Sequence, residues 1–325
     1  MTTVAARPER EWGYGSRAAG VRRVSDVTGD YLALRREAGL RQLDRGVIEA
    51  AGAAAGSFLQ GQLSQDVLAL SDGSASWSWL LMPNGKAVAR IRVIRVDSER
   101  YWLDLESAVL DAAFTRLQRF LLRTECTLRV DPDISSWGVR GPLASLVASE
   151  FTGDPIYRVA STWQGIGAVD VVGRGVLAPR NARSVGFDAW NSVRIEAGAA
   201  EAPGEINDKV IPQELGALDD SVSFTKGCYV GQELVARIDS RGHVNRWLAG
   251  LVVADPVIPP LGADVVVDDH VVGELTSIGE SLDLRAPVGL AWVRRSVAVD
   301  STIELRWSTG AVRARVAERP LVGAA

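Results

Sequence analysis

Apolar residues recur at helical spacing around residue 115, just after stretches that are typical of strands. This run predicts an amphipathic helix packed on a sheet, and its members are Leu110, Ala113, Phe114, Leu117, Phe120 and Leu121. Strand-like residues occupy 90–96 and 101–105. Further short helical patterns lie at 31–38, 53–63, 142–151 and 184–197. The first two thirds of the chain are therefore predicted to be α+β.

The pattern changes at Trp247. Short apolar runs now alternate with turns rich in Gly, Pro and Asp, and the runs are 248–253, 264–267, 271–278, 288–293, 302–307 and 312–316. Strands of this length and spacing, over roughly 70 residues, predict a small closed antiparallel barrel.

These patterns suggest where the chain divides. We expect an irregular lead-in at 1–24, an N-terminal α+β domain at 25–133, a second α+β domain at 134–243 and a C-terminal β-barrel at 244–325. A linker is expected around 239–246, before the barrel.

Composition narrows the class of protein. The 325 residues are 47% hydrophobic and 23% charged, as in ordinary soluble proteins, and the net charge of −4 argues against broad binding to nucleic acid or acidic membranes. No stretch approaches the length of a membrane span, and residues 1–23 lack the apolar core of a signal peptide. We therefore expect a cytoplasmic protein in a reducing compartment.

Cysteine and histidine are scarce. Two residues of each, with no CxxC or Cys/His cluster, offer neither a disulfide framework nor a metal site. So few histidines also make hydrolysis by a catalytic triad improbable. Cys126 follows the predicted helix in a strand-like segment, which is typical of an inert core residue.

The segment Lys226–Glu233 concentrates unusual residues. It places Cys228 beside Lys226, one of only three lysines, with glycines on both sides of the Cys-Tyr-Val step. A helix is predicted from Gln232, and a position just before a helix N-terminus, with an ammonium nearby, favours a thiolate. Arg237, Arg241 and His243 follow closely and could hold a carboxylate. The alternatives are a tight turn with a small buried cysteine and a set of ordinary exposed arginines.

Other polar residues are candidates for ligand contacts. Arg194 and Glu196 precede a predicted C-cap glycine, and they are either a solvated surface pair, which we favour from the sequence alone, or ligand contacts. Gln62 and Asp66 are polar positions in an otherwise apolar segment. Residues 203–218 form a long proline-punctuated loop, and loops of this length are often functional.

Three of these segments resemble one family. Residues 226–238 resemble the signature of YgfZ-type proteins, a branch of the superfamily named for the T-protein (aminomethyltransferase) of the glycine cleavage system. Residues 58–67 resemble that family's Phe-Leu-Gln-Gly-Gln-x-x-x-Asp-Val segment, and residues 194–198 resemble the superfamily's Arg-x-Glu-Ala-Gly segment. The resemblance covers nearly the whole chain. It implies a three-domain ring, two α+β domains plus the C-terminal barrel, around a cavity that binds tetrahydrofolate or a one-carbon-substituted form of it.

The resemblance also implies roles for residues. Glu196 corresponds to the carboxylate that hydrogen-bonds the pterin ring, with Arg194 beside it, and Gln62 and Asp66 lie in the segment that lines the cavity. Cys228 and Lys226 form the pair on which the function of the branch rests. Tyr229, inside the signature, and Arg237, a candidate carboxylate ligand, complete the expected folate contacts. No metal site is expected.

The implied function is that of a tetrahydrofolate-binding accessory protein with Cys228 as its functional thiol. Such proteins support the assembly or repair of iron–sulfur enzymes, including radical S-adenosylmethionine enzymes that modify tRNA. The expected partners are folate and iron–sulfur client or assembly proteins, with no direct contact to nucleic acid or membrane. Two cysteines are too few to hold a four-cysteine cluster within one chain.

A folate-dependent aminomethyltransferase-like enzyme is the alternative, so whether the protein is an enzyme stays open. True aminomethyltransferases carry an aspartate pair just after a glycine, whereas the corresponding residues 85–90 contain no carboxylate. That departure and Cys228 favour the accessory protein. A structural module without a ligand is a third hypothesis, under which replacing Cys228 would have no effect.

Overall fold

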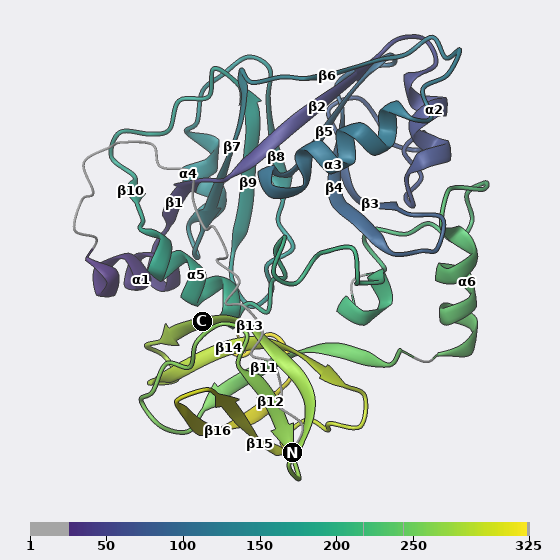
Figure 1. Ribbon diagram of the computed structural model, residues 1–325. Coiled ribbons are helices and arrows are strands. Elements are labelled where there is room, and N and C mark those ends of the chain that lie inside the picture. Colours follow the sequence, from purple (N-terminus) through teal and green to yellow (C-terminus); the bar gives the residue numbers. More distant parts are fainter. Residues whose placement is uncertain (1–25, 217, 243, 324–325) are drawn as a thin grey trace.

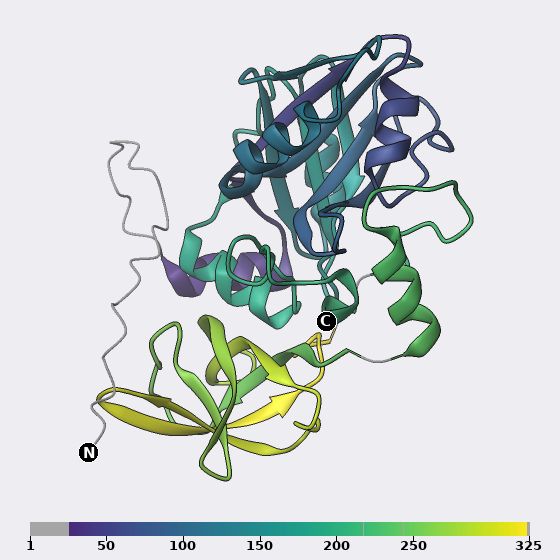
Figure 2. The ribbon, with the colours of Figure 1, turned by 45° about the vertical axis from the view of Figure 1, so that its right-hand side comes forward.

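The computed structural model describes residues 26–216, 218–242 and 244–323, with only the backbone given for 238–241. Two five-stranded sheets, each with helices against it, lie above a closed barrel (Figures 1 and 2). This arrangement confirms the predicted α+β ring with a C-terminal antiparallel barrel. None of the helices in the described ranges is long and apolar enough to cross a membrane.

The first sheet has the strand order β3-β4-β5-β2-β6. Its strands are β2 (Arg45–Ala51), β3 (Ala75–Leu81), β4 (Ala87–Arg95), β5 (Arg100–Glu106) and β6 (Thr127–Val130). Helices α2 (Ala55–Gln62) and α3 (Ser107–Gln118) belong to the same unit. Helix α3 confirms most of the amphipathic helix expected around residue 115, since Ala113 and Leu117 are fully buried in the core that it shares with the sheet. The helix ends at Gln118, however, and Phe120, which was expected on its apolar face, is exposed.

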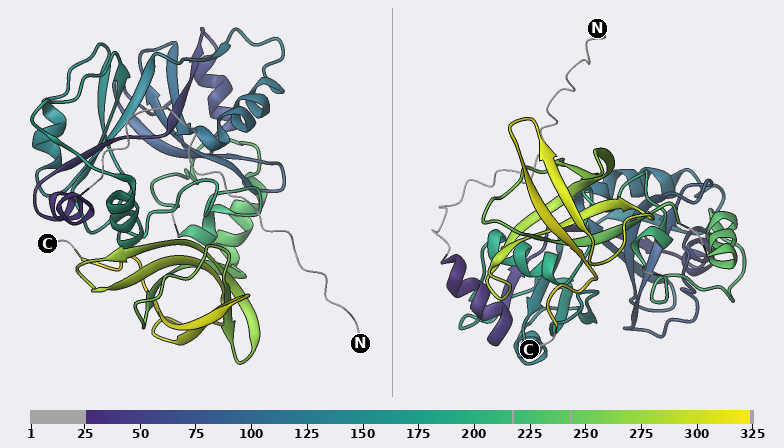
Figure 3. Two further views of the ribbon diagram at one scale, coloured as in Figure 1. Left: turned by 60° about the vertical axis from the view of Figure 1, so that its left-hand side comes forward. Right: turned by 90° about the horizontal axis from the view of Figure 1, so that it is seen from below.

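The second sheet has the order β10-β1-β7-β9-β8. Its strands are β1 (Gly39–Gln42), β7 (Ile134–Arg140), β8 (Ile156–Ala160), β9 (Ala168–Arg174) and β10 (Arg183–Ser184). Its helices are α1 (Val27–Arg36), α4 (Ala144–Ser149) and α5 (Phe187–Glu196), and the 3₁₀ turn η1 (Pro212–Leu215) follows. Helices α1 and α5 pack on each other, and α5 also packs on the barrel, as Figure 3 shows.

The barrel closes in the order β11-β14-β13-β12-β15-β16. Its strands are β11 (Arg246–Val253), β12 (Asp264–Val267), β13 (His270–Ser281), β14 (Ala286–Arg294), β15 (Thr302–Trp307) and β16 (Gly310–Ala317). Alternation produces its core, since Ile303 and Leu305 are buried while Thr302 and Arg306 are exposed. Closure pairs every strand on both sides, which removes exposed sheet edges.

The path of the chain differs in three places from the domain boundaries expected from the sequence. Helix α1 and strand β1 were expected in a domain at 25–133, but β1 pairs with β7 and β10 of the second sheet. The segment that follows η1 was expected in the second domain, yet it returns to the first sheet and packs on α2 and on the β3–β4 turn. Helix α6 (Gln232–Arg241) also continues into the residues expected to form a linker.

Gly231 of this returning segment packs tightly against the first sheet. Its φ is +85°, and an added Cβ would lie 2.7 Å from the carbonyl oxygen of Met82 and 2.8 Å from the Cβ of Leu81. Both the backbone angle and the space therefore require glycine. Gly227, at the other end of the same loop, has open space where a Cβ would be.

We predict that Gly231→Ala destabilises the fold by about 1–3 kcal/mol, because it combines a positive φ with a backbone clash. Gly227→Ala is the matched control and should change the free energy of unfolding little. Urea unfolding of both variants measures the difference. Equal stability of the two variants would show that the returning segment does not dock on the first sheet in this way.

Candidate functional site

Lys226 fastens the signature loop to the end of helix α2. Its ammonium donates hydrogen bonds to the carbonyl oxygens of Gln60 at 2.6 Å, Leu63 at 2.6 Å and Gln65 at 3.0 Å. Carbonyls at a helix C-terminus have no partner within the helix and carry partial negative charge, so they suit a cation. All three ammonium hydrogens are used, which makes Lys226 an anchor of the loop.

The anchored loop presents Cys228 to solvent. Cys228 is exposed, so the alternative of a small buried cysteine is wrong. The backbone N–H of Val230 donates to Gly61 O at 3.3 Å, and that of Tyr229 donates to Gln232 Oε1 at 3.1 Å, where α6 begins. Cys126 is buried, as expected for a core residue, and burial raises the pKa of its thiol.

The segment 58–67 lies against this loop. Asp66 accepts a hydrogen bond from Gln60 Nε2 at 3.0 Å, and its carboxylate is close enough to Lys226 to affect the pKa of the ammonium. Gln62 is buried and accepts from Arg116 Nη1 at 3.2 Å. Two segments that are far apart in the sequence, and that each resemble the family, are thus brought together.

Tyr229 and Arg237 differ in their surroundings. Tyr229 is buried, and burial raises the pKa of its phenol to about 12, while the Lys226 ammonium lies 5.1 Å from its ring centroid. Arg237 is exposed on α6 and contacts Glu233 at 2.6 Å, one helical turn earlier. The side chain of Arg241 and the whole of His243, which were expected to add positive charge here, lie outside the described part of the chain.

Glu196 and Arg194 are buried, so the favoured interpretation as a solvated surface pair is wrong. The Tyr31 hydroxyl donates to Glu196 Oε1 at 2.5 Å, and Arg35 Nε lies 4.0 Å from Oε2. Arg194 instead donates to Ala199 O at 2.7 Å and to Ser277 Oγ at 2.6 Å. The two side chains end in separate networks, which join α5 to α1 and to the barrel.

Burial dominates the electrostatics of Glu196. It raises the pKa of this carboxyl, and the Ser281 and Tyr31 hydroxyls and the Arg35 guanidinium oppose the rise. Oε2 nevertheless has no hydrogen-bond partner among the residues that the structure describes. One buried acceptor of Glu196 is therefore left without a full hydrogen bond.

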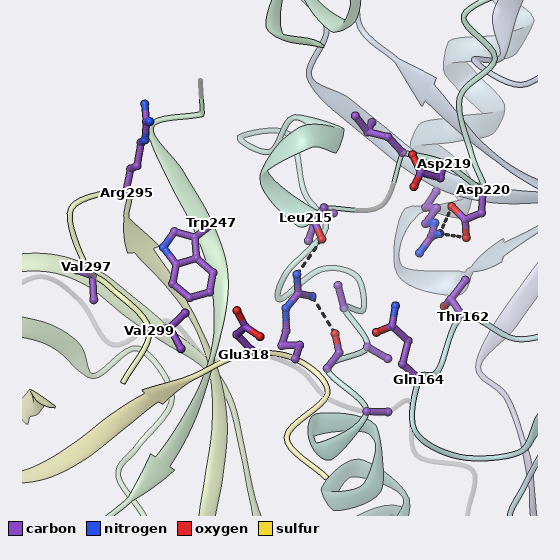
Figure 4. A pocket seen from close by; sticks show the side chains of 18 residues that line it. Thr162, Gln164, Leu215, Asp219, Asp220, Trp247, Arg295, Val297, Val299 and Glu318 are labelled. Atoms are coloured by element: carbon purple, nitrogen blue, oxygen red, sulfur yellow. Dashed lines mark hydrogen bonds and ion pairs between the residues drawn. The ribbon is translucent and has the colours of Figure 1, made fainter. Parts of the chain in front are cut away.

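A cavity of about 770 Å³ opens where the two sheets and the barrel meet (Figure 4). The backbone just after Glu196, at 197–200, forms part of its wall, and Arg90, Asp220, Trp247, Arg295 and Arg319 contribute side chains. None of the site residues predicted from the sequence, all of which are described, lines this cavity. The structure thus separates the cysteine loop from the cavity.

Arg90 and Asp220 were missed by the sequence analysis. Arg90 lies in the stretch noted for lacking carboxylates, but residues far along the chain supply one, since its Nη2 contacts both carboxylate oxygens of Asp220 at 2.8 and 3.0 Å. Asp219 and Asp220 belong to the segment that continues into Lys226 and Cys228. No local signal pairs these residues across 130 positions.

Comparisons place this architecture in a known class. Residues 246–322 match the family described as the glycine cleavage T-protein C-terminal barrel domain. The crystal structure of aminomethyltransferase T of the glycine cleavage system from Bartonella henselae superimposes with a TM-score of 0.79, at 19% identity, over 91% of this chain and 89% of that one. The chain therefore has the fold of the T-protein class.

Sequence relatives identify the branch. The tRNA-modifying protein YgfZ of Klebsiella pneumoniae is 30% identical over 228 residues, covering 64% of this chain and 69% of the relative. An uncharacterized protein of Haemophilus influenzae is 30% identical over 209 residues, covering 62% and 68%. An aminomethyltransferase of Halalkalibacterium halodurans is 24% identical over 300 residues, covering 82% and 81%. The chain belongs to the YgfZ family, which confirms the resemblance of its motifs.

The ammonium of Lys226 provides a test of the anchored loop. Burial lowers the pKa of Lys226 to about 8, and Asp66 opposes this change. In a sample with ¹³C-labelled lysine, one of the three lysine signals should titrate near pH 8, and it should vanish in Lys226→Met. A midpoint near the ordinary value of 10.5 would contradict the buried position of the ammonium.

The lowered pKa of Lys226 also determines how this residue affects the free energy of unfolding as the pH changes. The folded-state pKa lies below the unfolded value, so the unfolded chain holds more protons between about pH 8 and 10.5. The contribution of Lys226 to the free energy of unfolding should therefore rise with pH across this window. Urea unfolding of the wild type and Lys226→Met at both ends of the window measures it.

Proposed function

We propose that this protein is a tetrahydrofolate-binding accessory protein that supports the assembly or repair of iron–sulfur enzymes, including radical S-adenosylmethionine enzymes that modify tRNA. In this proposal it acts in the cytoplasm, with Cys228 as the functional thiol. The observation that carries the proposal is an exposed cysteine on a loop that Lys226 fixes by three hydrogen bonds. The name of the Klebsiella relative, a tRNA-modifying protein, supports the link to tRNA modification.

The position of Cys228 suits contact with a protein partner. An exposed thiol is reachable by a macromolecule, and anchoring of its loop lowers the conformational entropy that binding would otherwise cost. The other cysteine is buried, so a cluster held by several cysteines of this chain is not available. Any iron–sulfur contact would use ligands from the partner.

The cavity has the chemistry that a folate requires. Its volume of about 770 Å³ falls within the usual range for small-molecule sites. Leu215, Trp247 and Val297 offer apolar surface for the aromatic part, and Arg295 and Arg319 offer positive charge for carboxylates. Glu196 lies next to the cavity wall and has one oxygen without a full hydrogen bond, which supports it as the acceptor for pterin N–H groups. The contact with Tyr31 would have to open for a pterin to reach it.

One-carbon transfer is the second candidate, because several relatives are named aminomethyltransferases. Against it, strand β4 carries no carboxylate, and Asp220, a cavity-lining carboxylate that contacts this strand, is held by Arg90. A carboxylate paired with an arginine is a weak base for proton transfer. We therefore favour the accessory role.

Calorimetric titration with tetrahydrofolate tests the proposal. Wild type and Cys228→Ala should both bind saturably, since Cys228 does not line the cavity. Glu196→Gln should weaken binding by about 1–3 kcal/mol if its carboxylate accepts a pterin N–H. Glu318→Gln, which removes an exposed acid of the cavity wall, is the matched control.

Each result has a defined meaning. No binding to wild type would remove folate from the proposal. A loss with Glu318→Gln but not with Glu196→Gln would move the pterin acceptor to the cavity wall. Urea unfolding of each variant separates lost binding from lost folding.

A further inference from the structure

Arg90 is a buried cation, and its partner Asp220 accepts hydrogen bonds from only one of its guanidinium nitrogens. Its side chain is 10% exposed, and it lines the large cavity from strand β4. Asp220 contacts only Nη2, with both of its oxygens, and Nε has no hydrogen-bond partner within the described part of the chain. A guanidinium presents its donors as a planar fork that matches two carboxylate oxygens, so this geometry leaves part of the fork unused.

The two partners depend on the ion pair unequally. Asp220 is 48% exposed and can exchange Arg90 for water at small cost, as is usual for exposed carboxylates. Arg90 is surrounded by the rings of Trp77, at 4.9 Å, and Trp79, at 5.7 Å. A desolvated guanidinium needs an anion whether or not Asp220 supplies it.

Asp220 also stands at the junction of two cavities. A second cavity of about 430 Å³ shares Thr162 and Asp220 with the first and is lined by Arg92 and Trp77. Figure 4 shows the Asp220 carboxylate, with its two dashed contacts, at the edge of the large cavity. A ligand that entered either cavity would meet this carboxylate and the arginine behind it.

We propose that Arg90 is a carboxylate-binding residue of the cavity, and that Asp220 occupies it until a carboxylate-bearing ligand takes its place. The incoming carboxylate would bind Nε and Nη2 side by side, which satisfies the nitrogen that Asp220 leaves without a partner. The ligand class is a carboxylate, supplied either by the glutamate part of a folate or by a separate small carboxylic acid. The inference rests on the proposed function for the first of these sources only.

Displacement of Asp220 would alter the position of the loop that carries Cys228. The neighbouring Ser221 accepts, at its backbone oxygen, a hydrogen bond of 2.6 Å from Ser64 Oγ, and the Ser223 N–H donates to Ser64 O at 2.9 Å. Three residues further on, Lys226 binds the carbonyls at the end of α2. The segment that runs from Asp220 at the cavity to Cys228 is therefore hydrogen-bonded to residues 60–65 at Ser221, Ser223 and Lys226.

Binding to Asp220→Asn tests the inference. Asp219→Asn is the matched control, because Asp219 lines the same cavity and forms no ion pair within the described residues. Calorimetry would use tetrahydrofolate, free glutamate and 6-methyltetrahydropterin, which has no carboxylate. Asp220→Asn should bind at least one of the two carboxylate probes about tenfold more tightly than Asp219→Asn does, the scale of one charge-assisted hydrogen bond. Adding Arg90→Lys, which keeps the charge but loses the fork, should abolish the gain, and 6-methyltetrahydropterin should not respond.

The outcomes are distinguishable. A gain for tetrahydrofolate alone assigns the carboxylate to folate, and a gain for glutamate assigns it to a separate small acid. A gain for glutamate without any binding of tetrahydrofolate to wild type would defeat the proposed function but support this inference. Equal affinities of Asp220→Asn and Asp219→Asn for both carboxylate probes would overturn it, and Asp220 would then be a structural partner of Arg90.

Discussion

The ion pairs buried between the two sheets are the constraint on which the rest of the molecule depends. Arg92 of β4 contacts Asp104 of β5 and, at 2.5 Å, Asp170 of β9, and Asp170 also contacts Arg140 of β7 at 2.7 Å. All four side chains are almost fully buried, so removing one partner would leave an uncompensated charge in the interior, which is strongly destabilising. The network therefore fixes how the sheets face each other, and it places Arg90, two residues before Arg92 on the same face of β4, at the cavity.

The second constraint is the return of the chain to the first sheet after η1. Lys226 binds three carbonyls at and just beyond the end of α2, and Gly231 packs on the backbone at Met82. These contacts tie the only exposed cysteine in the described residues to a rigid helix end. A functional thiol needs both access and a defined position, and this arrangement supplies both. It also puts the thiol at one end of a segment whose other end, Asp220, reaches the cavity.

Patterns that depend on neighbouring residues were predictable. The barrel strands alternate with turn residues, and helix α3 follows from its apolar spacing, so local periodicity was enough. The signature motif also identified the loop at Cys228. Contacts between residues far apart in the sequence could not be predicted from local patterns. Glu196 was interpreted as a surface residue because charged side chains near a helix end are usually solvated, but Tyr31, 165 residues away, and a barrel turn cover it. The partners of Lys226 are backbone carbonyls more than 160 positions distant, which no side-chain pattern reveals.

The proposed role of Cys228 is that of the functional thiol of a protein that supports iron–sulfur enzymes. The most direct measurement is the level of a tRNA modification made by a radical S-adenosylmethionine enzyme, in a bacterium whose own YgfZ gene has been deleted. We expect that wild type and Cys126→Ala restore the modification and that Cys228→Ala, present in equal amount, does not. Full restoration by Cys228→Ala would show that Cys228 is not the functional thiol.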